Sequence, residues 1–159
     1  MPAFLRLAAA LLLAISLPLA AAPMHEQYLP PDDLNVRDGQ PQDQQLLQIT
    51  DYSVVIGTQR QSTQQPIPIT TPLLVRLQGK PMNKGGSATQ VLMHFDPDSK
   101  SLKKPAYDAD SKTLSLYYPP SQYRAVMDLL RNGTVYCQYL VYPNGHVWAD
   151  LHTGQMHVR

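Results

Sequence analysis

Thr134-Val-Tyr-Cys-Gln-Tyr-Leu-Val-Tyr-Pro-Asn-Gly-His-Val-Trp-Ala-Asp-Leu-His152 is the stretch of the sequence that decides the fold. Two segments rich in aromatic and β-branched residues flank an Asn-Gly pair, which is typical of a β-hairpin with a type I′ turn. With Asn144 and Gly145 as the two loop residues, Tyr142 faces Val147 and Cys137 faces His152. We therefore expect an antiparallel hairpin in the C-terminal part of the chain.

This register divides the hairpin into two faces, because directly opposite residues share one side of the sheet. The more uniformly apolar face is the better candidate for the core, and it carries Tyr136, Leu140, Tyr142, Val147, Ala149 and Leu151. The other face is mixed in character, and it carries Cys137, Tyr139, Val141, Trp148, Asp150 and His152, with His146 near the turn.

Cys137, His152 and Asp150 on the mixed face are the candidate catalytic residues. A thiol facing an imidazole that a carboxylate orients is the arrangement of nucleophilic thiol catalysis. Thiol hydrolases usually place the cysteine at a helix N-terminus, and this hairpin supplies neither such a helix nor an evident oxyanion hole. We therefore expect a non-enzymatic protein, with a small thiol-dependent hydrolase using Cys137 and His152 as the alternative.

The same face offers ligand types that zinc or copper accepts. Alternate residues of a strand lie ~6.5–7 Å apart, so His146 is roughly 13 Å from Asp150 and cannot share an ion with it. Cys137, Asp150 and His152 would form a site that lacks a fourth ligand. The sequence therefore predicts neither a metal site nor a cofactor.

Tyr139, Trp148 and His146 are the candidate binding residues, because aromatic side chains with a polar tip suit recognition surfaces. If the mixed face is exposed, these residues form a contact site for a protein. If a helix covers that face, they are core residues. We favour burial in the core for Trp148.

A helix is predicted over residues 121–132. Ser121 follows Pro119-Pro120 and can cap the helix, and Asn132-Gly133 ends it. Apolar residues recur at helical spacing between these signals, at positions Tyr123, Val126, Met127 and Leu130.

Strands are predicted upstream of this helix, where apolar residues alternate between turn signals. These strands cover residues 46–56, 73–78, 89–95 and 113–118. With 15 Pro and 8 Gly in the chain, short strands are favoured over long helices. The predicted fold class is α+β, a mainly antiparallel sheet of about five to seven strands with one packed α-helix.

The N-terminus has the pattern of a secretory signal peptide: Arg6, a short apolar run, Pro18 and small residues. The run is shorter than the ~20 residues of a membrane span. We expect cleavage after Ala21, then a polar flexible arm over residues 22–44, and a single domain over residues 45–159. The mature chain is expected in the periplasm or outside the cell, without a membrane span.

Net charge argues against nucleic-acid binding, and the cysteine count excludes a disulfide-stabilised domain. The leader contains Arg6, so the 13 Lys and Arg of the chain fall to 12, which balance the 12 Asp and Glu. A neutral protein is a poor nucleic-acid binder, because that affinity comes from neutralising phosphates. The single cysteine excludes an intramolecular disulfide. We expect an exported inhibitor, immunity or accessory factor that binds a protein or envelope partner; the sequence does not define its oligomeric state.

Overall fold

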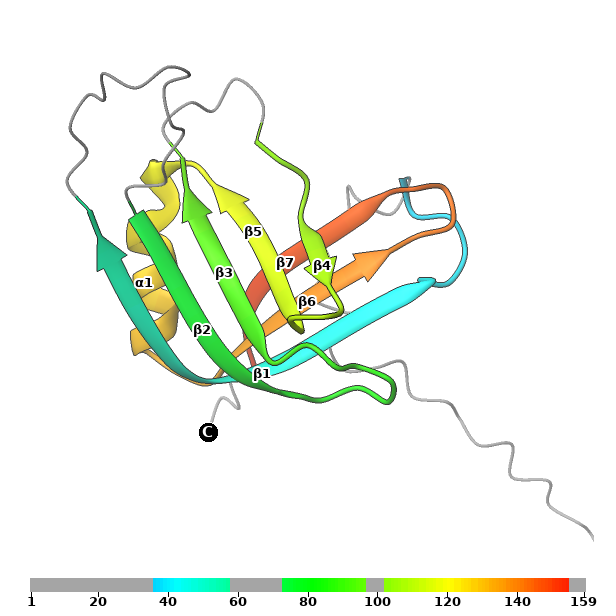
Figure 1. Cartoon of the computed structure of the whole chain (residues 1–159), viewed down its shortest axis with the longest axis horizontal. Helices are drawn as coiled ribbons and strands as arrows, with labels where there is room; N and C mark the ends of the chain where they lie inside the picture. The colour runs from blue at the N-terminus through cyan, green and yellow to red at the C-terminus, as the bar shows by residue number, and fades with distance from the viewer. Residues whose placement is uncertain (1–35, 58–72, 97–101, 155–159) are drawn as a thin grey trace, which may run out of the picture.

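The computed structural model describes residues 36–57, 73–96 and 102–154. Seven strands of mixed direction form one curled sheet, accompanied by one short helix (Figure 1). The strands are β1 (Asp43–Ile56), β2 (Leu73–Pro81), β3 (Gln90–Phe95), β4 (Ala106–Asp108), β5 (Thr113–Tyr118), β6 (Val135–Val141) and β7 (Val147–Thr153). A 3₁₀ turn, η3 (Pro120–Gln122), leads into the helix α1 (Tyr123–Arg131).

The order of the strands in the sheet is β4-β5-β3-β2-β1-β6-β7. Five of the six neighbouring pairs are antiparallel, and β3 and β5 pair in parallel. The expected mainly antiparallel sheet with a packed helix is thus matched only roughly. The parallel pair arises because β4 lies between β3 and β5 in sequence and pairs with β5 on its outer side.

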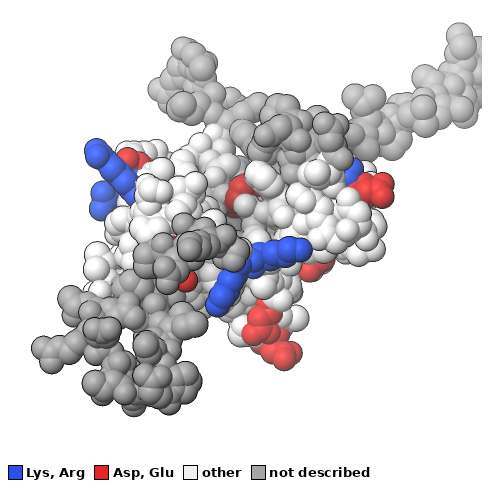
Figure 2. Space-filling model, turned by 90° about the horizontal axis from the view of Figure 1, so that it is seen from above, with Lys and Arg blue, Asp and Glu red and all other residues white. Residues whose placement is uncertain are grey.

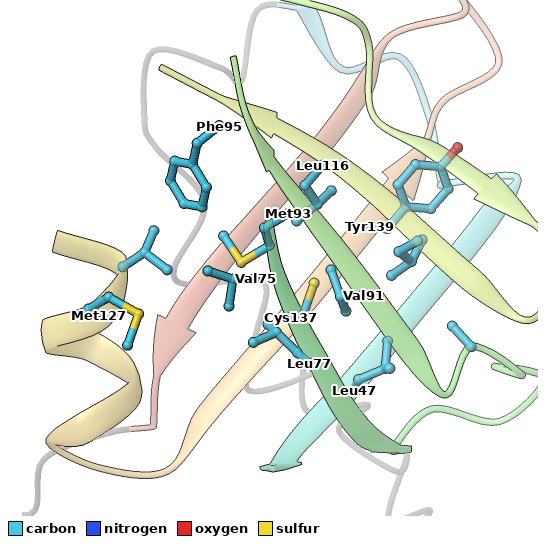
Figure 3. Close-up of a cluster of buried hydrophobic side chains, with 13 residues drawn as sticks. Leu47, Val75, Leu77, Val91, Met93, Phe95, Leu116, Met127, Cys137 and Tyr139 are labelled. Carbon is cyan, nitrogen blue, oxygen red and sulfur yellow. The ribbon is translucent and has the colours of Figure 1, made fainter. Parts of the chain in front are cut away.

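The core occupies the concave side of the sheet, where alternate residues of each strand point inward. The alternation of apolar residues places Val75 and Leu77 on one face of β2, and Val91, Met93 and Phe95 on one face of β3; all five are buried. Figure 3 shows this cluster between the strands, with Met127 of α1 at its side. The alternation in the sequence therefore predicted the inner face of these strands correctly.

The helix α1 closes one end of the curled sheet (Figure 1). Val126 and Met127 are buried in the core, and the ring of Tyr123 meets the Phe95 ring edge-on at 5.4 Å. The predicted apolar stripe is confirmed, but Gln122 rather than Ser121 is the N-cap, because the 3₁₀ turn precedes the helix.

Polar side chains tie the β2–β3 loop to β1. The side-chain carbonyl of Gln45 accepts hydrogen bonds from the backbone N–H groups of Ser87 (2.8 Å) and Ala88 (3.1 Å). Asn83 accepts from the N–H of Leu46 (2.9 Å) and donates to the carbonyl of Gln44 (2.8 Å). These bonds satisfy backbone groups of β1 and of the loop that are buried or partly buried.

The first strand begins slightly before the expected strand over residues 46–56, since β1 starts at Asp43. The backbone N–H of Gln42 donates to the carbonyl of Val141 at 2.7 Å, and the Asn144 amide donates to the carbonyl of Val36 at 2.7 Å. The end of the predicted arm therefore contacts the hairpin. The predicted leader and residues 22–35 of the arm lie outside the described residues.

Within the described ranges, no helix is long and apolar enough to cross a membrane. On the face of the molecule shown in Figure 2, basic and acidic side chains are interspersed among uncharged ones.

Candidate functional site on the β6–β7 hairpin

The turn between β6 and β7 has three loop residues, not the predicted two. The N–H of Gly145 donates to the carbonyl of Tyr142, and the N–H of Tyr142 donates to the carbonyl of His146, both at 2.9 Å. Gly145 has a φ of +80°, whereas Asn144 is not among the residues with positive φ. This is the geometry of a type I turn followed by a glycine bulge, and Pro143 fits its second position because its φ is fixed near −65°.

The extra loop residue shifts the register by one, so the predicted register is wrong. Cys137 pairs with Leu151, and His152 pairs with Tyr136. A shift of one residue moves every side chain of one strand to the other face. The inner face of the hairpin therefore carries Cys137, Tyr139 and Val141 with Val147, Ala149 and Leu151.

Tyr139, predicted as a binding residue, is a core residue. Only 7% of it is exposed, and its ring lies 6.5 Å from that of Tyr107 in β4. This contact brings the edge strand β4 over β6 and shows how far the sheet curls. The predicted mixed face is thus divided: its β6 residues belong to the core, and its β7 residues lie on the outer face.

The structure does not place Cys137, a candidate catalytic residue, where a nucleophile could meet a substrate. It is fully buried, and Figure 3 shows its sulfur pointing into the core cluster between Leu77 and Val91. Burial, and secondarily the negative charge of Asp150, raise the pKa of the thiol far above its ordinary value of 9.0. The Cys137/His152 pair that the thiol-hydrolase alternative requires is contradicted, because these residues lie on opposite faces of the sheet.

The outer face of β7 carries Trp148, Asp150 and His152. Together with His146, which directly precedes the strand, we call these residues the outer row. The carboxylate of Asp150 joins two of its neighbours. One oxygen accepts from the indole N–H of Trp148 at 2.5 Å, and the other lies 2.6 Å from Nδ1 of His152. The Tyr136 ring, directly opposite on β6, stacks on the His152 ring at 5.8 Å.

These contacts hold the outer row in a fixed arrangement on a half-buried surface. The side chains of His152 and Asp150 retain 10% and 17% exposure, and Trp148 is half-buried outside the core cluster. Trp148 is therefore not the core residue that we favoured. The row keeps the carboxylate–imidazole contact of a catalytic site, but Cys137 lies on the far side of the sheet.

The outer face of β6 is buried as well as its inner face. Gln138, which pairs with Asp150, is 0% exposed, and Leu140 is 1% exposed. Among the described residues, neither polar atom of the Gln138 side chain has a hydrogen-bond partner. The described residues hold no group of three His, Cys, Asp or Glu that could bind a metal ion.

The pairing of β1 with β2 shifts register between Ile49 and Asp51, which marks a β-bulge in β1. A cleft of about 200 Å³ opens between this bulge and the end of α1. Ile49, Thr50, Asp51, Tyr52, Leu130, Gly133 and Val135 line it. Thr50 and Asp51 direct their side chains to local backbone groups, so they stabilise the bulge.

His94, on the outer face of β3, is a further residue that the sequence did not single out. Its ring stacks on the Tyr117 ring at 5.0 Å, and the ammonium of Lys103 lies 5.6 Å from the centre of that tyrosine ring. Partial burial, followed by the charge of Lys103, lowers the pKa of His94 below 6.5. No local pattern in the sequence could have placed these three side chains together, because β3 and β5 meet only through the parallel pairing.

The chain matches no protein-family model, no curated protein and no solved structure.

Proposed function

We propose that the chain is an exported, non-enzymatic binding protein of the periplasm or cell envelope, an inhibitor, immunity or accessory factor. We further propose that it contacts a macromolecular partner through the outer row. The N-terminal sequence pattern supports export. The position of Trp148 on the outer face, outside the core, carries the proposed binding surface.

The hydrogen bond to Asp150 favours binding because it fixes the indole before a partner arrives. A side chain that is already ordered loses less conformational entropy on binding. Tryptophan is also among the residues that contribute most to protein interfaces. The outer row combines this aromatic group with a carboxylate and two imidazoles, whose directional hydrogen bonds can orient a partner.

Affinity capture from an envelope extract tests the binding surface, with the wild-type chain compared to Trp148→Ala. We expect the wild type to retain a partner that Trp148→Ala loses. Ile56→Ala is the matched control, because Ile56 is a large apolar residue with 72% exposure on β1. If Trp148→Ala and wild type capture the same partner equally, the outer row is not the binding surface.

The stability of the same variants separates a contact residue from a core residue. Trp148→Ala is expected to cost about 1.5–3 kcal/mol, because it removes a hydrogen bond to a carboxylate. Leu116→Ala, in the core, is expected to cost about 2–5 kcal/mol. Urea unfolding measures both, and a loss for Trp148→Ala as large as that for Leu116→Ala would assign Trp148 to a structural role.

Mass measurement of the protein from its native host tests export. A processed chain should begin near Ala22 or Pro23. Intact Met1 in a soluble envelope fraction would contradict cleavage of the leader.

A further inference from the structure

The two edges of the sheet are protected to different degrees. Edge strands expose unpaired backbone groups, and proteins protect them with short length, lysines, proline or bulges. The β4 edge has three such protections: it is three residues long and follows Lys103, Lys104 and Pro105. The β7 edge is seven residues long and contains neither lysine nor proline.

The hydrogen bonds of the hairpin show which backbone groups of β7 point away from β6. The N–H of Tyr142 bonds to His146, and the N–H of Gly154 bonds to Thr134 at 3.4 Å. Because hydrogen-bonded and non-bonded pairs alternate in an antiparallel ladder, Trp148, Asp150 and His152 also bond to β6. The N–H and carbonyl groups of Val147, Ala149 and Leu151 therefore point to the free edge.

Within the described part of the chain, β7 pairs with β6 alone. The inner face of this edge is apolar, since Val147, Ala149 and Leu151 all pack partly against the core cluster. A strand that adds to β7 would extend both the backbone ladder and this apolar face. The edge is thus built to accept a strand with the same alternation of apolar and polar residues.

We propose that the partner of this edge is a second copy of the chain, with the two β7 strands paired antiparallel about a two-fold axis at Ala149. In this register Ala149 faces its own copy, and Val147 faces the partner's Leu151. These three pairs supply about six backbone hydrogen bonds, two for each hydrogen-bonded pair. A two-fold interface of this kind uses the same patch on both copies.

Repulsion between like charges favours a two-fold axis at Ala149 over an axis at the adjacent residue, Asp150. An axis at Asp150 would place two carboxylates directly opposite each other, which is destabilising. An axis at Ala149 instead places Asp150 opposite the partner's Trp148, so that no two carboxylates face each other. The apolar residues on the inner face remain matched with apolar residues.

Ala149→Pro is the sharpest test, because it removes an N–H that points to the free edge and leaves the β6–β7 ladder complete. Sedimentation equilibrium of the purified chain should show a concentration-dependent dimer. Ala149→Pro should weaken dimerisation at least about tenfold, because two central hydrogen bonds are lost. Ala149→Gly is the matched control: it also lowers strand propensity but keeps the N–H, so it should still dimerise.

Hydrogen exchange on the wild-type chain gives a test that needs no variant. The amides of Val147, Ala149 and Leu151 should exchange quickly in dilute protein and slowly in concentrated protein. The amides of Trp148, Asp150 and His152 bond to β6, so they should be protected at both concentrations. A monomer at every concentration, an equally strong Ala149→Pro dimer, or concentration-independent exchange at the edge amides would overturn the proposal.

Discussion

Cys137 shows how the chemistry of one residue depends on which face of a strand it occupies. On the outer face it would meet the imidazole of His152. On the inner face it packs among apolar side chains with its thiol neutral, because burial raises its pKa. Burial raises the pKa of the Tyr118 phenol as well, and the nearby Cys137 thiol adds to this shift.

Ionisation of the Cys137 thiol and the Tyr118 phenol should lower the stability of the fold at alkaline pH. Their pKa values are higher in the folded chain than the ordinary 9.0 and 10.0, so the unfolded chain ionises first. Their contribution to the free energy of unfolding is fully present below about pH 9 and is lost as the pH rises, by about 1.4 kcal/mol per pH unit and group.

Urea unfolding between pH 7 and pH 11 measures this slope. Cys137→Ala should lower stability at pH 7 but remove the part of the decline that begins near pH 9. Equal slopes for wild type and Cys137→Ala would show that the thiol does not titrate differently in the folded chain.

At the scale of one element, the hairpin turn depends on Gly145. Its φ of +80° is readily adopted by glycine and strained for a β-branched residue. Gly145→Val should therefore cost on the order of 1 kcal/mol or more. Gly145→Asn is the control, because asparagine tolerates a positive φ far better than a β-branched residue does. Thermal melting of both variants checks the difference; equal melting temperatures would argue against this turn.

The elements show what local sequence patterns can and cannot predict. Alternation located β2 and β3 and gave their inner faces, and helical spacing gave the buried stripe of α1, because these patterns report burial directly. The hairpin was located correctly, but its register was wrong because Pro143 adds a third loop residue. That single shift placed Cys137 and Tyr139 of β6 on the inner face with Ala149 and Leu151, and so separated Cys137 from His152.

At the scale of the whole molecule, the curl and the parallel β3/β5 pair had no signal in the sequence. Both depend on contacts between distant segments, such as Tyr107 against Tyr139. The same holds for the outer row: its residue types were identified, but their neighbours across the sheet were not. The network around Gln45 and Asn83 was missed because it joins a strand to a loop about 40 residues away.

The boundary of the domain leads to a prediction about truncation. A chain that begins at residue 36 should melt within a few degrees of the chain that begins at residue 22, because the removed segment is polar. A chain that begins at residue 45 should melt lower, because it loses the pairs of Asp43 with Val141 and of Gln44 with Leu140. Calorimetry distinguishes the two, and equal melting temperatures would show that the start of β1 contributes nothing to stability.

The place of β1 in the sheet also bears on how the chain reaches its fold. As the chain leaves the ribosome, β1 appears first and can pair early with β2, but its other side waits for β6, because Asp43 pairs with Val141. Contacts between such distant segments make folding slow. Until the last third of the chain has emerged, Leu47 lacks its neighbour in the sheet, Cys137 of β6. The growing chain therefore carries an open apolar edge during synthesis, and its yield should depend on how well the cell shields that edge.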